Sequence, residues 1–101
     1  MLKYFRVILV VLVLFMNFFD LTSAVDKRIG STPPCLWTIG ATSDYVKIRE
    51  DLISEHEDCK CWSDWEADNE KIALSVVEHF RNNGLRYKPN GEANSKYVYL
   101  F

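Results

Sequence analysis

The stretch SDWEADNEKIALSVVEHFRNNG, residues 63–84, has the most regular pattern in this sequence. Ser63 and Glu66 are spaced as in a capping box, in which each side chain satisfies a backbone N–H at the start of a helix. Apolar residues recur with helical spacing along the stretch, at Trp65, Ile72, Ala73, Val76, Val77 and Phe80. Gly84 suits the left-handed position that follows a helix end. The pattern therefore predicts an amphipathic helix that begins at Ser63 and ends before Gly84.

Two further elements are predicted before this helix. Residues 35–39 form a short strand in this interpretation, because Pro33 and Pro34 hold the preceding backbone extended and Gly40 ends the run. Thr42 or Ser43 can cap a second helix over residues 44–55. Its apolar positions are Tyr45, Val46, Ile48, Leu52 and Ile53. We expect this helix to bury an apolar stripe and expose a charged back.

A terminal hairpin is predicted after the long helix. Residues 85–88 and 96–101 both alternate, and Pro89, Asn90 and Gly91 turn the chain between them. The second strand carries apolar residues on both faces, so we expect it to lie inside the sheet. The predicted fold is an α+β domain ordered strand, helix, helix and β-hairpin, stabilised by a disulfide.

The disulfide is predicted from three cysteines, Cys35, Cys59 and Cys61. Because Cys59 and Cys61 are too close in sequence to bridge each other without strain, Cys35 is expected to pair with one of them. That bond would close a loop of roughly 25 residues and stabilise the fold by about 3–4 kcal/mol. The third thiol is then free, buried as a small apolar residue, or bonded to a second chain in a homodimer.

The N-terminus has the composition of a secretory signal peptide. A short basic start precedes an apolar run over residues 7–19, and small residues end at Ala24, the expected cleavage point. Lys27 and Arg28 form a dibasic pair. Two interpretations are equally favoured, a second cleavage after Arg28 and two exposed charges in an N-terminal tail. The expected organisation is a signal peptide over residues 1–24, a short propeptide over 25–28 and one secreted domain over 29–101. The apolar run is too short to favour stable membrane insertion.

The charge balance excludes several classes of partner. Residues 29–101 carry eight Lys and Arg against twelve Asp and Glu, a net charge of −4 with both histidines neutral. Nucleic-acid binding draws its affinity from a basic surface, so we do not expect it here.

Neither catalysis nor a bound metal is predicted. No serine stands in a nucleophile elbow, and Cys61 with His79 imitates a thiol and base only in composition. His56, Cys59 and Cys61 lie within six positions of one another, but a structural zinc site needs four ligands in two spaced groups. We expect no enzyme activity, no metal and no cofactor.

The aromatic residues are the best binding candidates, because they are enriched at the centres of protein interfaces. Trp62 stands in a connector where packing has least claim on it, and Tyr87 and Lys88 stand beside the predicted turn. Two loops, residues 31–37 and 88–95, could present a protease-inhibiting surface.

The layout of signal peptide, dibasic Lys27-Arg28 and small cysteine-containing domain resembles precursors of arthropod venom toxins and of secreted peptide hormones. The resemblance implies a secreted effector that binds an extracellular receptor, channel or host protein. Two alternatives stay open, an endogenous signalling or reproductive-fluid peptide and a protease inhibitor.

Overall fold

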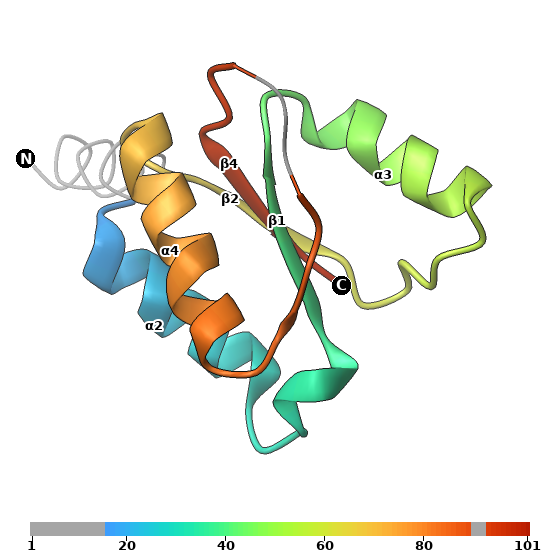
Figure 1. The fold of residues 1–101 in the computed structure, drawn as a ribbon, viewed down its shortest axis with the longest axis horizontal. Coiled ribbons are helices and arrows are strands. Elements are labelled where there is room, and N and C mark those ends of the chain that lie inside the picture. The colour runs from blue at the N-terminus through green and yellow to red at the C-terminus, as the bar shows by residue number, and fades with distance from the viewer. Residues whose placement is uncertain (1–15, 90–92) are drawn as a thin grey trace, which may run out of the picture.

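The structure is a computed structural model in which residues 16–89 and 93–101 are described. Over those residues the chain is a small α+β domain with three α-helices, one 3-10 turn and a four-stranded mixed sheet (Figure 1). In chain order the elements are α2 (Phe18–Ile29), η1 (Pro34–Leu36), β1 (Thr38–Thr42), α3 (Tyr45–Ser54), β2 (Ser63–Glu66), α4 (Glu70–Asn82), β3 (Arg86–Tyr87) and β4 (Tyr97–Leu100).

The sheet has the strand order β2-β4-β1-β3. β4 is antiparallel to both of its neighbours, and β3 is parallel to β1. Tyr99 is the partner of Gly40 on one side and of Asp64 on the other. The interior position of β4 follows from its sequence, because Val98 and Leu100 face one side while Tyr97 and Tyr99 face the other.

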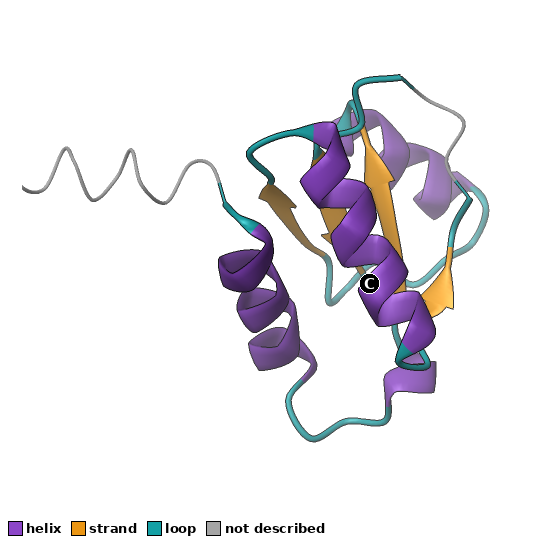
Figure 2. Cartoon of the chain, turned by 60° about the vertical axis from the view of Figure 1, so that its left-hand side comes forward, coloured by secondary structure: helices purple, strands orange, loops and turns teal. Residues whose placement is uncertain are grey.

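Helices α2 and α4 cover the Val98 side of the sheet. They lie side by side, and Figure 2 shows α4 crossing in front of the strands. The core between helices and sheet is formed by Leu21, Val25, Ile29, Trp37, Ile39, Ala41, Ala67, Ala73, Val76, Val77, Phe80, Leu85, Val98 and Leu100. This cluster is the main apolar core of the domain.

Helix α3 lies on the opposite side of the sheet, far from α2 and α4 in Figure 1. A smaller cluster joins it to β4 and consists of Leu52, Cys59, Tyr99 and Phe101, with Ile48 and Trp62 packed against them. Both faces of the sheet are therefore buried, but to different extents.

The predicted order of strand, helix, helix and hairpin is wrong. Ser63–Glu66 is strand β2, paired with β4, and the helix begins at Glu70 with Asn69 as its N-cap. The Asn69 Oδ1 atom accepts from the Ile72 N–H at 2.9 Å. β3 pairs with β1 and makes no hairpin with β4. Tertiary pairing thus overrides the capping-box pattern and the turn signal, which are both local.

The predicted disulfide is also wrong, because Cys35, Cys59 and Cys61 are all unbonded. Cys35 lies exposed in η1, and Cys61 is exposed just before β2. Cys59 is buried between α3 and β4, where it fills space as a small apolar residue. The structure therefore depends on its two apolar clusters in place of a covalent bridge.

The predicted cleavage points fall within α2. Ala24 is half-buried in the middle of the helix, and Lys27 and Arg28 form its last turn. Leu21, Val25 and Ile29 are buried on either side of Ala24, so a cut there would divide a helix that belongs to the core. Residues 1–15, with most of the predicted apolar run, lie outside the described residues. None of the helices in residues 16–89 and 93–101 has the length and apolar character needed to cross a membrane.

Candidate functional site

The outer face of α3 exposes aliphatic side chains. Of the ten described residues of this helix, Leu52 alone is buried, although Ile48 also packs against the smaller cluster. Val46 and Ile53 are 54% and 52% exposed. With Arg49 and Glu50 between them, they follow the i, i+3, i+4, i+7 spacing of one helix face. This face therefore presents two aliphatic residues to solvent where a surface helix would ordinarily be polar.

Trp62 lies beside this face and is held firmly in place. Its ring stacks on Tyr99 with centroids 5.1 Å apart and on Phe101 with centroids 5.9 Å apart. The Trp62 Nε1–H donates to Asp64 Oδ2 at 2.7 Å, and the Arg49 guanidinium lies 6.0 Å from the ring centroid. The indole is half-buried and its orientation is fixed by stacking and hydrogen bonding together.

A groove of about 210 Å³ separates α3 from the start of β2. It is lined by Tyr45, Val46, Arg49, Glu50, Ile53, Trp62 and Asp64, which we call the α3 groove. Tryptophan, tyrosine and arginine are the residue types most enriched among binding hot spots, and the α3 groove contains one of each. Its apolar walls and charged rim are chemically suited to binding a protein side chain.

An aromatic pair lies at the N-terminal end of α3, where Tyr45 lines the groove. The rings of Tyr45 and Tyr97 meet at a tilted angle, with centroids 5.2 Å apart. Burial raises the pKa of Tyr97, and the nearby charge of Glu66 raises it further. Glu66 is in turn paired with Lys96 at 3.2 Å. Tyr97 therefore stays protonated at neutral pH.

The structure does not bring Trp62 and Tyr87 together. Tyr87 pairs in register with Ile39 and lies beneath the Arg81 guanidinium of α4, 4.8 Å from the ring centroid. It therefore shares the α4 side of the sheet, whereas Trp62 stacks on the α3 side. Lys88 forms an ion pair with Glu55 at 3.5 Å. The three predicted binding residues thus do not line one groove.

The sequence interpretation missed Val46, Arg49 and Ile53 as site residues. A signal for them is present, because the apolar positions Tyr45, Val46, Ile48, Leu52 and Ile53 cover too wide an arc for one buried stripe. Some of them had to remain exposed, but only the position of β4 decides which.

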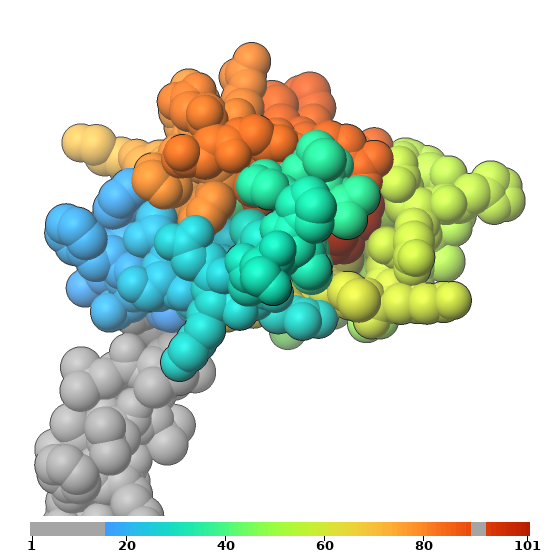
Figure 3. Space-filling model, turned by 90° about the horizontal axis from the view of Figure 1, so that it is seen from below, coloured from blue at the N-terminus to red at the C-terminus, as the bar shows by residue number. Residues whose placement is uncertain are grey.

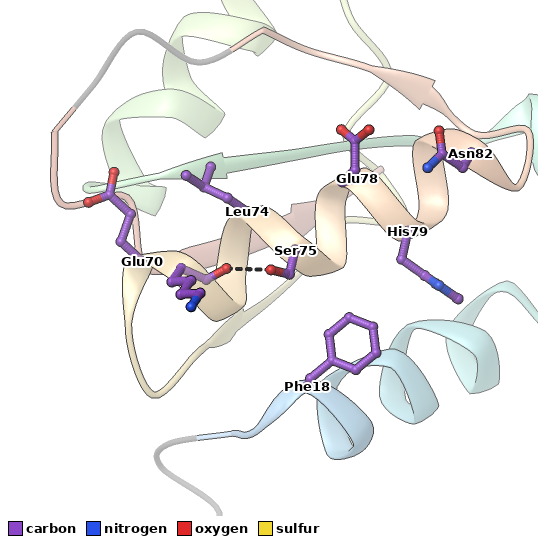
Figure 4. Close-up of a pocket in the computed structure, with 8 residues that line it drawn as sticks. Phe18, Glu70, Leu74, Ser75, Glu78, His79 and Asn82 are labelled. Carbon is purple, nitrogen blue, oxygen red and sulfur yellow. Dashed lines mark hydrogen bonds between the residues drawn. The ribbon is translucent and has the colours of Figure 1, made fainter.

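A larger groove of about 750 Å³ runs along α4 next to α2 (Figure 4). His79 points toward Phe18 across this groove, with ring centroids 5.8 Å apart, while Leu74 and Glu78 point away from α2. The remaining lining residues are mostly polar or charged. This groove has fewer anchoring side chains than the α3 groove despite its size.

Cys61 lines a third cavity, of about 300 Å³, with Trp37, Arg86 and Phe101 among its walls. Figure 3 shows the C-terminal end of the chain in dark red at this hollow, between the teal and yellow-green segments. His79 does not line it, so the structure does not join Cys61 and His79 into a thiol and base pair. Within residues 16–89 and 93–101 there is no group of three His, Cys, Asp or Glu side chains that could hold a metal ion.

The two loops considered for protease inhibition have different outcomes. Residues 34–36 form a 3-10 turn, so the first loop does not present the continuous extended strand that fits a protease cleft. The second loop includes residues 90–92, which lie outside the described residues.

The chain matches no protein-family model, no curated protein and no solved structure. The structure defines the protein as a small α+β domain with an aromatic-lined groove beside helix α3.

Proposed function

We propose that this protein is an extracellular binding protein whose α3 groove receives an apolar side chain from a basic segment of another protein. The observation that carries the proposal is the exposure of Val46 and Ile53 next to the fixed ring of Trp62. The extracellular location rests on the predicted signal peptide alone, whose expected cut after Ala24 falls within α2.

The apolar part of the groove supplies binding energy. Full burial of a Val or Ile side chain is worth about 1.5–3 kcal/mol, so covering the exposed halves of Val46 and Ile53 contributes roughly 1 kcal/mol each. Trp62 adds an immobilised, half-exposed aromatic side chain that loses little conformational entropy on binding.

The charges near the groove favour a basic partner. Glu50 and Asp64 line it against a single cation, Arg49, which already lies over the Trp62 ring. Complementary charge speeds association and fixes orientation more than it adds affinity.

A secreted effector aimed at another organism and an endogenous signal would use such a groove in the same way. The tissue that makes the protein distinguishes them, since a venom or salivary gland favours the effector and an endocrine or accessory gland favours the signal.

The groove can be tested without knowing the natural partner. A random peptide library displayed on phage is selected on the immobilised 101-residue protein, and the enriched peptides are synthesised and titrated. Ile53→Ser is compared with Leu74→Ser, because both residues are partly exposed helix positions that line a groove, at 52% and 43%.

We expect enriched peptides with an apolar residue flanked by Lys or Arg. Their affinity should fall about 5-fold or more in Ile53→Ser, stay unchanged in Leu74→Ser and weaken as salt is added. The proposal fails if no peptide is enriched, if the peptides are acidic, or if Leu74→Ser weakens binding as much as Ile53→Ser.

A further inference from the structure

The dibasic pair, Lys27 and Arg28, lies in the helical last turn of α2. Lys27 and Arg28 are exposed, but the helix is completed behind them by the Gly30 N–H, which donates to the Asp26 carbonyl at 2.9 Å. Ile29, the residue directly after the dibasic pair, is 8% exposed. The bond between residues 28 and 29 therefore joins an exposed residue to a buried one.

The Arg28 side chain ties this turn to a distant part of the chain. Its Nε atom donates to Ser63 Oγ at 2.9 Å, and a terminal guanidinium nitrogen donates to the Cys61 carbonyl at 3.2 Å. The guanidinium also lies 5.6 Å from the Trp37 ring centroid. Arg28 thus connects the end of α2 with the start of β2 and with the main core.

The segment on the other side of the bond is tied down as well. Thr32 Oγ1 donates to the Ile29 carbonyl at 2.5 Å and accepts from Trp37 Nε1–H at 2.7 Å. The Thr32 N–H donates to the same carbonyl at 3.3 Å. Side-chain contacts therefore hold the chain on both sides of the bond between residues 28 and 29. Trp37 takes part on each side, since it contacts both the Arg28 guanidinium and Thr32 Oγ1.

We propose that Arg28 acts as a latch which masks its own cleavage site, so that proteolysis after Arg28 occurs in unfolded or locally opened chains and not in the folded protein. An endoprotease binds its substrate in an extended conformation. To reach it, the last turn of α2 must unwind and release the Arg28 contacts, and cleavage then tracks the population of the opened state.

The contacts of the latch allow a test that leaves the cleavage sequence unchanged. Ser63→Ala removes the acceptor of Arg28 Nε but leaves the amino-acid sequence around the cleaved bond unchanged. Ser75→Ala is the matched control, because its Oγ donates to the Lys71 carbonyl on the surface of α4, with no contact to Arg28. The full chain of each variant is incubated with an endoprotease specific for dibasic sites, and intact mass reports the appearance of residues 29–101.

We expect the native protein to be cut far more slowly than the same chain in urea at a concentration the protease tolerates. Ser63→Ala should raise the native rate by about 2- to 10-fold, the range set by the loss of one hydrogen bond, while Ser75→Ala leaves it unchanged. Circular dichroism and the rate in urea check that the variants remain folded and equally cleavable once unfolded. Equal rates for native and unfolded protein, or equal native rates for all three chains, would overturn the proposal.

Discussion

Gly40 sets how closely β1 and β4 can pack on the α3 side of the sheet. The Tyr99 ring lies over this position, and a Cβ atom added to Gly40 would come within 2.4 Å of ring atoms. A glycine opposite an aromatic residue on the neighbouring strand lets the ring lie flat on the backbone. The small cluster beneath Trp62 depends on that arrangement, because Trp62 stacks on the same ring.

Gly40→Ala is expected to reduce the free energy of unfolding by about 1–3 kcal/mol, since Tyr99 must move out of its place between Gly40 and Trp62. Urea unfolding monitored by circular dichroism measures the change. The matched control introduces Gly40→Ala into a Tyr99→Ala background, where the added methyl group should cost much less. An equal cost in both backgrounds would show that the ring contact is not the cause.

The three thiols should differ in reactivity. Cys35 and Cys61 are exposed and Cys59 is buried, so an alkylating reagent at pH 8 should modify two thiols of the native protein quickly and the third only after denaturation. Mass spectrometry of the peptides identifies the slow residue. Fast alkylation of Cys59 in the native protein would contradict the packing of the smaller cluster.

The pH dependence of stability follows from the same residue. Burial raises the pKa of Cys59 above its ordinary value of 9.0, and Glu57 and Asp58 raise it further while Arg49 opposes them. The folded protein therefore holds this proton more tightly than the unfolded chain. Its contribution to stability is complete below pH 9 and is lost as pH rises through the folded pKa. As pH rises from 8 to 10, the free energy of unfolding should therefore fall less in Cys59→Ala than in the parent protein, as measured by urea unfolding at each pH.

At the scale of elements, the start of α4 depends on Asn69. Asn69→Ala should destabilise the protein by about 1 kcal/mol, because the Ile72 N–H loses its acceptor. Asn69→Asp keeps an acceptor oxygen and should have little effect. Thermal unfolding of the two variants against the parent protein gives the comparison, and an equal loss in both would show that the cap is not responsible.

Part of this element order could be read from the sequence. Helix α3 is predicted over residues 44–55 and forms over Tyr45–Ser54. The predicted cap is wrong, because Asp44 and not Thr42 or Ser43 caps the helix, with its Oδ1 accepting from the Lys47 N–H at 3.1 Å. Gly84 has a φ of 100° after the end of α4, as the local pattern predicted. The interior place of β4 also followed from its alternation. These features were predictable because each depends on a few neighbouring residues.

The remaining elements depend on distant partners. The capping-box spacing of Ser63 and Glu66 is satisfied equally well by a short strand, and pairing with β4 decides between the two. β3 is only two residues long and joins β1, its partner more than 40 residues away, through a parallel register that no turn sequence announces. The exposed Val46 and Ile53 were visible as apolar residues, but their role as groove walls required the position of Trp62.

At the scale of the whole molecule, two apolar clusters replace the expected covalent bridge. The larger one lies between the sheet and helices α2 and α4, and the smaller one fastens α3 to β4. A reducing agent should therefore leave the unfolding temperature unchanged. Loss of a structural disulfide would lower it by about 10 °C or more in a domain of this size. Thermal unfolding with and without reductant measures this difference. A large decrease in the unfolding temperature on reduction would show that a structural disulfide is present.

The place of β4 in the sheet has a consequence for biosynthesis. β1 and β2 are neighbours only through β4, which is the last of the described strands to leave the ribosome. Until then neither earlier strand has its main hydrogen-bonding partner, and Tyr99 and Phe101 are missing from the surface on which α3 docks. The sheet therefore cannot be completed until β4 has been synthesised, and a chain that has not completed its fold can still be threaded through a translocation pore.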